Sequence, residues 1–410
     1  MDQIISKIVV SSVFLVPAFL LATNSWTVAI IALLVLISSS YLLKNKASIE
    51  LNRFDWLVIT ALSGYFAINI PIAILDGSTL RYFQGGVRLL LCIPIYLMLS
   101  QMANSHQSIR EWLSKGIIVG SVGACFIAIY QFFILGVPRV DGFLFSINFA
   151  YLSCALTFLA FGFAFQSKLP SLLLVASVFS AFATVLTFSR GSILAIPVLL
   201  ILGIGLKWSV LNKKKVIWIG VSLVLLSVSS YFISPTIKGR VDFTAAEFHS
   251  VKQGDYQSAE SSGTRLYLWK AAIEAYKTSP LIGLPYRDRE ALNKKLYEQG
   301  KVNEYTRNLP RGHAHSQYFE MLASTGSLGI VGIFLMLIVP FMVFIQHYRH
   351  TQSIWGYTGA LFVAGFILYC LTEAPLQANL ISTFYGFMLA TFFAMVRIEK
   401  YNQPKINAEK

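Results

Sequence analysis

The chain has 410 residues, of which 56% are hydrophobic and only 13% are charged, and its formal net charge is +14. A soluble globular chain carries about 25% charged residues, so this chain has too little polar surface for a water-soluble body. Membrane proteins concentrate Lys and Arg in their cytoplasmic loops. The positive charge therefore favours a membrane topology over a nucleic-acid partner.

The apolar residues form blocks of about 20 residues, the length that a helix needs to cross a bilayer. This pattern predicts an all-α fold, a polytopic transmembrane bundle of about 12 helices. In chain order the blocks cover residues 6–22, 27–43, 55–75, 83–103, 116–136, 143–165, 169–188, 191–207, 216–234, 316–346, 354–372 and 375–396. The long tenth block is either one tilted helix or two segments that separate near Gly332.

Basic residues gather in every second connection between the blocks, as the positive-inside rule predicts for cytoplasmic loops. These connections and the C-terminal tail hold Lys44, Lys46, Arg53, Arg110, Lys115, Lys168, Lys207, Lys213, Lys214, Lys215, Arg349, Arg397, Lys400, Lys405 and Lys410. The short connections on the other side hold only Arg81, Arg139 and Arg190, with Arg88 slightly deeper. With twelve spans, this bias predicts that both termini are cytoplasmic.

The longest polar segment follows the ninth block, and this topology places it outside. We expect N-terminal transmembrane helices over residues 1–234, a large outer loop over 235–314, and C-terminal transmembrane helices with a cytoplasmic tail over 315–410. Residues 264–277 predict an amphipathic helix, and residues 287–299 predict a second, more polar one. The apolar side of the first helix would hold Leu266, Trp269, Ile273 and Tyr276.

Two arginines on the outer side are candidates for binding. Arg190 lies in TFSRGS between two apolar blocks with almost no loop, where an arginine either snorkels to the interface or guards a site. Arg265 begins the helix expected over 264–277, and is either a solvated charge or part of the same site. Trp269, one turn further on, either shapes a pocket or anchors in the membrane interface.

Further arginines enrich the same face, among them Arg88 inside the fourth block and Arg311 at the exit of the loop. Guanidinium groups bind phosphate oxygens in pairs. An outer cavity lined by arginines therefore predicts an anionic, phosphorylated and lipid-linked substrate.

The segment RGHAHSQYFEMLASTGSLG, residues 311–329, holds His313 and His315 immediately before a long apolar block. Histidine titrates near neutral pH and can act as a general base or acid. A metal site needs three or four ligands, and the sequence shows no compact set of further His, Cys or carboxylate partners, so we expect no metal. A purely structural histidine cap is the remaining alternative.

Several short motifs follow one another in the C-terminal two thirds of the chain, around the long outer loop. They are Ser189-Arg190-Gly191, Arg265-Leu-Tyr-Leu-Trp269, Pro280-Leu-Ile-Gly283, His315-Ser316-Gln317 and Gly326-Ser-Leu-Gly329. In order and spacing this layout resembles the bacterial O-antigen ligase and polymerase family. The N-terminal spans resemble the family only in number and hydropathy.

The resemblance implies a membrane-embedded glycosyltransferase of the GT-C-like type, without a cofactor, in the bacterial inner membrane with its active site on the periplasmic side. It implies an undecaprenyl-pyrophosphate-linked O-antigen as donor and the lipid A-core oligosaccharide as acceptor. By motif match, Arg190 and Arg265 would hold the donor pyrophosphate, and His315 would be the essential histidine. We expect further contacts to pyrophosphate or glycan from Arg88, Arg311, His313 and Trp269.

Two details depart from the family pattern. The position after the histidine is often Asn in the family and is Ser316 here. His313 precedes His315 by two residues, so either could be the essential histidine. We place the role on His315, which adjoins the tenth span, and expect single displacement with inversion at the anomeric carbon.

Three other functions stay open at this stage. The polymerase of the same family, which joins O-antigen units on the polyprenyl carrier, is the closest, and a protein-glycosylating oligosaccharyltransferase is more distant. A lipid-linked glycan transporter or flippase belongs to another class. Transporters often have repeated halves, and the sequence shows no such symmetry.

Overall fold

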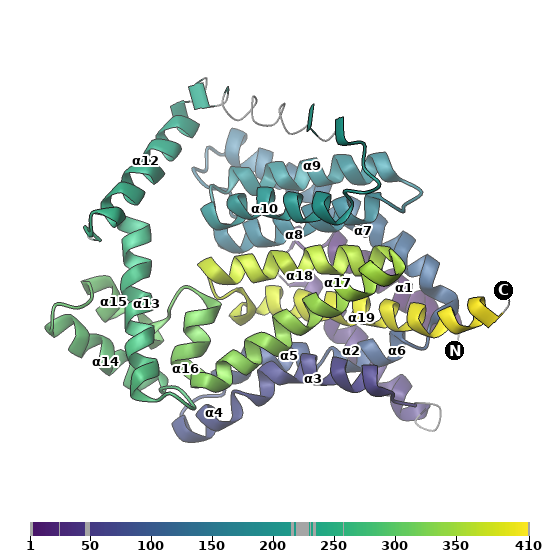
Figure 1. Cartoon of the computed structure of the whole chain (residues 1–410), viewed down its shortest axis with the longest axis horizontal. Coiled ribbons are helices and arrows are strands. Elements are labelled where there is room, and N and C mark those ends of the chain that lie inside the picture. The colour runs from purple at the N-terminus through teal and green to yellow at the C-terminus, as the bar shows by residue number, and fades with distance from the viewer. Residues whose placement is uncertain are drawn as a thin grey trace.

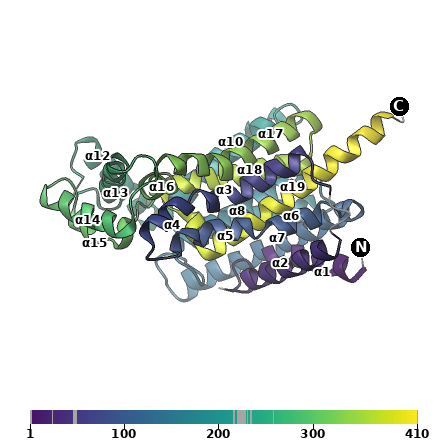
Figure 2. The same cartoon turned by 90° about the horizontal axis from the view of Figure 1, so that it is seen from below.

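The computed structural model describes residues 3–23, 25–45, 50–214, 217–218, 229, 231–232, 235–256 and 258–408. Within these residues the chain is helical and has no strand, which confirms the all-α fold class. Long helices form one bundle, and a smaller helical group lies at one end of it (Figures 1 and 2).

The helices fall into three groups along the chain. The first group is α1 (Gln3–Ala18), α2 (Trp26–Lys44), α3 (Arg53–Ala67), α4 (Ile70–Asp76), η2 (Arg81–Phe83), α5 (Gln84–Leu90), α6 (Ile93–Leu99), η3 (Ala103–Ser105), α7 (His106–Ile129), η4 (Tyr130–Ile134), α8 (Ser146–Ala164), α9 (Pro170–Leu186) and α10 (Arg190–Leu206). The second is α12 (Pro235–Lys252), α13 (Glu260–Thr278), α14 (Tyr286–Glu298), α15 (Glu304–Asn308) and η5 (Pro310–Gly312). The third is α16 (Gln317–Ile333), η6 (Phe334–Ile338), α17 (Val339–Thr351), α18 (Ile354–Thr372), η7 (Pro375–Gln377) and α19 (Asn379–Ala408).

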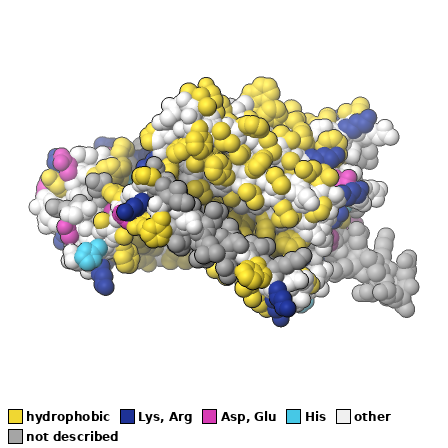
Figure 3. Space-filling view, turned by 90° about the horizontal axis from the view of Figure 1, so that it is seen from above, with side chains coloured by type: hydrophobic (Ala, Val, Ile, Leu, Met, Phe, Trp, Pro, Cys, Tyr) yellow, Lys and Arg dark blue, Asp and Glu magenta, His cyan; other side chains and the backbone are white. Residues whose placement is uncertain are grey.

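Eight helical segments among the described residues are long and apolar enough to cross a membrane, and α1, α9 and α10 are shorter apolar helices. Together they match the expected blocks except 216–234, most of which lies outside the described residues. Apolar side chains cover the middle of the bundle, whereas charged ones gather toward its two ends (Figure 3). The chain is therefore a polytopic membrane protein, and the count of about 12 spans stays a prediction.

Local sequence signals explain where several spans begin. The Asn52 side chain and Asp55 form a capping box at the start of α3. Ser353 accepts hydrogen bonds from the first amides of α18, and Pro170 occupies the first turn of α9. These residues satisfy or remove amides that would otherwise lack a partner at a helix end.

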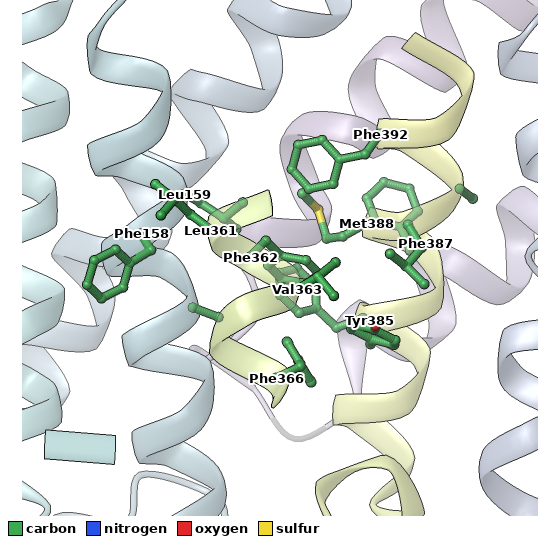
Figure 4. Close-up of a cluster of buried hydrophobic side chains, with 14 of the residues drawn as sticks. Phe158, Leu159, Leu361, Phe362, Val363, Phe366, Tyr385, Phe387, Met388 and Phe392 are labelled. Atoms are coloured by element: carbon green, nitrogen blue, oxygen red, sulfur yellow. The ribbon is translucent and has the colours of Figure 1, made fainter. Parts of the chain in front are cut away.

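The core of the bundle lies where α8, α18 and α19 meet. Large apolar side chains from the three helices interlock there, among them Phe158, Leu159, Leu361, Phe362, Phe366, Tyr385, Met388 and Phe392 (Figure 4). Small residues let the helices approach closely, since a Cβ on Gly162 would lie 2.6 Å from Oγ1 of Thr358. In a membrane such close packing, rather than the hydrophobic effect, holds helices together.

The long tenth block is one helical segment, Gln317–Thr351, and does not separate at Gly332. Its irregularities lie elsewhere, at Gly326 with a left-handed φ of +59° and in the π-helical turn η6. The backbone at Gly326 bends against Pro280 and Leu281, and Ser327 N–H donates to the Pro280 carbonyl at 2.8 Å. The PLIG and GSLG motifs thus pack on each other, and glycine permits the close approach.

The segment between the two sets of spans is helical and lies at the end of the bundle opposite the C-terminal end of α19 (Figure 1). Helix α14 agrees within one residue with the helix expected over 287–299, whereas α13 begins four residues before Thr264. The expected apolar face of α13 is covered only in part, because Leu266, Trp269 and Tyr276 are half-buried. Ile273 is exposed, and the buried face consists of Leu268, Ala271, Ala272 and Ala275. Small alanines allow α13 to lie close to α16, and this contact decides which face is covered.

Candidate functional site

The motif His315-Ser316-Gln317 is fastened to the turn between α18 and α19. The Ser316 hydroxyl donates to the Cys370 carbonyl at 3.2 Å, and the Gln317 amide donates to the Glu373 carbonyl at 2.9 Å. The Gln317 side-chain oxygen accepts from the Leu376 amide at 3.2 Å. These bonds hold the histidine directly beside Glu373, far away in sequence.

His315 and Glu373 form a hydrogen-bonded pair. His315 Nδ1 lies 2.7 Å from Glu373 Oε2, and the side chains are 29% and 14% exposed. Since an ionised carboxylate only accepts, Nδ1 donates the hydrogen, and Nε2 is the nitrogen that carries the lone pair whenever the imidazole is neutral. Burial would raise the pKa of Glu373, but the hydrogen bond from His315 and the electrostatic interaction with the two imidazoles bring it below its ordinary value. Glu373 is therefore ionised at neutral pH.

His313 supports this pair from the side. Its Nδ1 accepts a hydrogen bond from the His315 amide at 3.2 Å, and the two rings meet edge to face with centroids 4.7 Å apart. His313 Nε2 lies 3.8 Å from Glu373 Oε1. Burial lowers the pKa of His313, so this imidazole is neutral at pH 7.

The three side chains could also hold a metal ion, since one ligand atom from each of His313, His315 and Glu373 lies within 4.8 Å of the others. Two histidines and a carboxylate are a ligand set that zinc takes in enzymes. An ion would have to replace the 2.7 Å hydrogen bond between His315 and Glu373. The sequence alone shows no third ligand, because Glu373 is distant along the chain, and the expectation of no metal stays a prediction.

A buried ion pair holds the histidine segment in place. Arg289 of α14 donates to both carboxylate oxygens of Glu320 in α16, at 2.8 and 3.0 Å, and both side chains are 2% exposed. Arg289 also donates to the Gly312 carbonyl, while Glu320 accepts from the Ala314 amide at 2.8 Å. The pair thus binds the backbone on both sides of His313 and ties the loop to the bundle.

The histidines open into a cavity of about 520 Å³. Its lining comes from separate parts of the chain: Tyr65, Asn69, Arg81, Tyr82, Gln84, Gly85, Phe145, Ser146, Ile147, Asn148, Tyr286, Arg311, His313, His315, Met321, Ser324, Glu373, Ala374, Gln377 and Ala378. The lining combines amide side chains, aromatic rings and two arginines. Such a surface suits a polar, hydroxyl-rich molecule that carries negative charge.

One wall of the cavity is an aromatic stack. The rings of Tyr82 and Tyr286 lie 4.2 Å apart and nearly parallel, and the Arg311 guanidinium lies 5.9 Å from the Tyr286 ring centre. The Tyr82 hydroxyl donates to Asp76 at 2.5 Å and accepts from the Tyr286 amide at 3.0 Å. This network joins the outer loop to the short helix α4 of the bundle.

A second cationic group surrounds the SRG turn. Arg190 pairs with Glu247 of α12, Arg139 donates to the Thr187 carbonyl at 3.1 Å, and the Arg240 guanidinium lies 5.3 Å from the Phe188 ring centre. Burial lowers the pKa of Arg139, and the charges of Arg240, Arg190 and Arg265 lower it further. We call Arg139, Arg190, Arg240 and Arg265 the arginine cluster.

The arginine cluster and the histidine cavity adjoin each other at Thr372. Gly191, next to Arg190, packs so closely on Thr372 that a Cβ would collide with its hydroxyl. Tyr151 hydrogen-bonds Thr372 at 2.9 Å and lies within electrostatic reach of both Glu373 and Arg265. Glycine in the SRG turn is thus needed for α10 to approach the residue that precedes Glu373.

Most of the residues singled out from sequence lie at these two places. Arg311, His313 and His315 line the cavity, and Arg190 and Arg265 belong to the arginine cluster. Trp269 and Arg88 lie at neither place. Trp269 stacks on Phe319 with ring centres 4.8 Å apart, and Arg88 donates to the Gln84 carbonyl within its own helix.

Five charged participants are absent from the residues that the sequence pattern singles out, namely Glu373, Glu247, Arg240, Arg289 and Glu320. Glu373 leaves one signal, because it is a lone carboxylate in the short turn between two apolar blocks on the same side as the loop. Such a residue is costly near a membrane and is therefore a candidate. The others lie among many charged or polar neighbours, and nothing in their spacing distinguishes them.

Comparison with known proteins shows which family this part of the chain is similar to. Residues 175–334 match the family model described as O-antigen ligase, which spans the SRG turn, the outer loop and most of the tenth block. An uncharacterized protein of Haemophilus influenzae is 23% identical over 358 residues, covering 84% of this chain and 87% of the relative. The segment 175–334, which carries Arg190, Arg265 and His315, is therefore similar to the O-antigen ligase family.

Proposed function

We propose that the protein is an O-antigen ligase. It transfers the O-antigen glycan from undecaprenyl pyrophosphate to the lipid A-core oligosaccharide. The observation that carries the proposal is the His315–Glu373 pair, which opens into a polar cavity on one side and adjoins the arginine cluster on the other. A base between an anion site and a glycan-sized cavity suits transfer between a diphosphate-linked donor and a hydroxyl acceptor.

The arginine cluster is the proposed site of the donor pyrophosphate, with Arg190 and Arg265 as its main ligands. Negative charge builds on the phosphate oxygen as the bond to the sugar breaks. Guanidinium groups already placed there stabilise this charge more strongly in the transition state than in the ground state. Arg139 adds a further positive charge, and its hydrogen bond to the Thr187 carbonyl holds its guanidinium group in place.

The cavity is the proposed site of the acceptor glycan. Its amide groups, from Asn69, Gln84, Asn148 and Gln377, can bind sugar hydroxyls. Arg81 and Arg311 lie where phosphate groups on an acceptor would meet them, since both line the cavity. Because Arg88 and Trp269 lie outside this lining, contacts to substrate from these two are proposed only for parts of the donor beyond the cavity.

The reaction is a single displacement at the anomeric carbon. An acceptor hydroxyl oxygen forms the new bond to carbon as the bond to the pyrophosphate oxygen breaks, with inversion of configuration. His315 Nε2 takes the hydroxyl proton, and the ionised Glu373 stabilises the imidazolium that forms. Undecaprenyl pyrophosphate leaves with the electron pair of the broken bond, and the guanidinium groups of the arginine cluster bind its negative charge.

The proposal includes metal independence, because the arginine cluster already supplies the positive charge that a divalent ion would bring to the diphosphate. Purified protein treated with EDTA should keep its transfer rate within about twofold. Removal of a catalytic ion would cause a far larger loss, because such an ion stabilises the transition state by several kcal/mol. Loss of the activity with EDTA and its recovery with zinc would instead assign His313, His315 and Glu373 as metal ligands.

We propose the bacterial inner membrane as the location, with both termini cytoplasmic and the site periplasmic. The alternation of basic loops supports this placement. The end of α19 also lies opposite the helices α12 to α15 (Figure 1). A cysteine introduced at exposed Lys301 in the outer helical segment should react with a membrane-impermeant maleimide in intact spheroplasts, and one at Lys213 should not.

Deletion of the gene in its host separates the ligase from its alternatives. Loss of the whole O-antigen ladder, with long glycan accumulating on the polyprenyl carrier, is the expected result. Lipid A-core carrying a single repeat unit would mean the polymerase. An unchanged ladder would contradict both enzymes, and a transport assay for lipid-linked glycan would then test the flippase.

A further inference from the structure

Among the described residues, helix α12 contacts the bundle through buried Glu247, which pairs with Arg190, and through Arg240, which lies over the Phe188 ring. Glu247 is 2% exposed, and it is the one buried side chain among those described in α12. The remaining side chains of the helix include exposed Val241, Phe243 and Phe248. The position of α12 therefore depends strongly on what Glu247 binds.

The groups that Glu247 is seen to bind among the described residues would equally bind a phosphate. Its carboxylate accepts from the Arg190 guanidinium, from the Ser261 amide at 2.7 Å, and from the amide and hydroxyl of Ser262 at 3.3 Å each. The two amides belong to the first turn of α13, whose dipole also favours an anion. Arg190 in turn belongs to the arginine cluster, so this carboxylate pairs with one of several guanidinium groups that lie within electrostatic reach of Arg139.

Burial would raise the pKa of Glu247, but the hydrogen bonds from Arg190 and the serine amides bring it below its ordinary value. The carboxylate is thus ionised and acts as an internal anion. A diphosphate offers more oxygens and more negative charge than one carboxylate. In the same arginine-rich place it is therefore the stronger ligand.

We propose that Glu247 occupies, in the enzyme without donor, the position that one phosphate of the donor diphosphate takes when it binds, and that binding releases α12 from α13. The subsite would consist of Arg190, the amides of Ser261 and Ser262, and the Ser262 hydroxyl. This inference rests on the proposed function, since it takes a diphosphate-linked glycan as the ligand. It adds two serines and a competing carboxylate to the site.

Competition has a measurable cost. If the form with Glu247 in the subsite is populated about 90% of the time, it weakens the apparent affinity for an anion about tenfold. Removal of the carboxylate should therefore strengthen the apparent affinity for an anion by the same factor of about ten. A carboxylate that merely orients Arg190 predicts the opposite, since its loss would misplace the arginine and weaken binding.

The experiment measures binding of inorganic pyrophosphate to the full chain in nanodiscs, for the native protein, Glu247→Ala and Glu247→Gln. The expected result is binding about tenfold tighter in both variants, as the population argument requires. Arg190→Ala should abolish binding with or without the Glu247 substitution. Equal or weaker binding in both Glu247 variants would overturn the proposal.

Hydrogen–deuterium exchange on the same samples tests the release of α12. Pyrophosphate should increase exchange over residues 240–252 of the native protein, whereas in Glu247→Gln these amides should exchange fast without ligand. Protection of α12 by pyrophosphate would contradict the release. Glu274→Ala is the matched control, because Glu274 is an α13 carboxylate that pairs with surface Lys277 and has no contact with Arg190.

The O-antigen ladder in cells distinguishes this inference from the proposed function. Tighter pyrophosphate binding in Glu247→Ala, with a ladder that is unaffected by Arg190→Ala, would support the phosphate subsite and contradict the ligase. A ladder lost in Arg190→Ala, with unchanged pyrophosphate binding in Glu247→Ala, would keep the ligase and overturn the role of Glu247.

Discussion

The two ends of the bundle each hold two histidines that share one glutamate. At the cavity these are His313 and His315 with Glu373, at 3.8 and 2.7 Å. At the other end His106 and His347 lie 3.6 and 2.7 Å from the carboxylate of Glu399. The residue types and distances are nearly the same, so composition alone does not explain why one group should be reactive.

The surroundings of the two groups differ. His347 is 2% exposed inside α17, and Glu399 also accepts from the Ser353 hydroxyl at 2.5 Å, so that group joins four helices, α7, α17, α18 and α19. His315 is 29% exposed, stands at a left-handed φ of +46° just before α16, and lines a cavity. A histidine–carboxylate pair becomes a candidate base when its second nitrogen has room for a substrate, and otherwise it joins helices.

The largest contrast should come from removing one histidine at each end. His315→Ala should lower the transfer rate by about 10²–10⁴-fold, the usual contribution of a general base. His347→Gln should lower the melting temperature and leave the rate per folded molecule near that of the native protein. Transfer assays on detergent-purified protein, normalised to folded protein, would measure both. A similar loss of rate in the two variants would remove the distinction.

The cavity end also has a rigid frame in the Arg289–Glu320 pair. Arg289→Met leaves the Glu320 carboxylate buried without its partner, which should cost about 3–5 kcal/mol of unfolding free energy. The double variant Arg289→Met with Glu320→Leu should be less destabilised than the single one. Thermal unfolding in one detergent compares the three proteins, and a double variant worse than the single one would argue against this frame.

Glutamate substitutions sharpen the comparison further. Glu373→Gln keeps a hydrogen bond to His315 but removes the charge that stabilises the imidazolium, and should cost about 10–100-fold in rate, as partners behind a functional group do. Because the pKa of Glu373 lies below its ordinary value, this carboxylate should stay ionised down to mildly acid pH in the native protein. Glu399→Gln serves as the control and should leave transfer unchanged; equal losses would be inconsistent with the account.

The smallest effect is expected at His313. Its Nδ1 accepts from the His315 amide, and the Asn side-chain oxygen can take that place. His313→Asn should therefore retain most of the rate, and His313→Ala should lose several-fold, about the 1–2 kcal/mol of an unpaired buried group. Since the imidazole is neutral at pH 7, neither variant should change the pH profile above pH 7. A complete loss in His313→Asn would move the base from His315 to His313.

Much of the fold follows from the sequence because it depends on local signals. Apolar blocks and caps such as Asn52 predict the spans, and helical periodicity predicts α14 almost to the residue. The buried face of α13 does not follow, since close approach to α16 favours alanines over the larger Ile273. Periodicity ranks residues by hydrophobicity, whereas packing selects them by size.

The candidate site is predictable in part for a similar reason. His315 and Arg190 stand in short motifs at the ends of spans, where a polar residue is conspicuous. Glu373 acquires its role only because Ser316 and Gln317 bind the turn that contains it. Long-range hydrogen bonds of this kind leave no pattern in a single sequence.

Transfer with defined substrates tests the central claim most directly. Purified native protein and His315→Ala would be supplied with undecaprenyl-pyrophosphate-linked O-antigen and lipid A-core, and the products separated. The account predicts that the native protein releases undecaprenyl pyrophosphate and forms glycosylated lipid A-core with inverted anomeric configuration, and that His315→Ala forms almost none. Product formation at the native rate by His315→Ala, or retention of configuration, would contradict it.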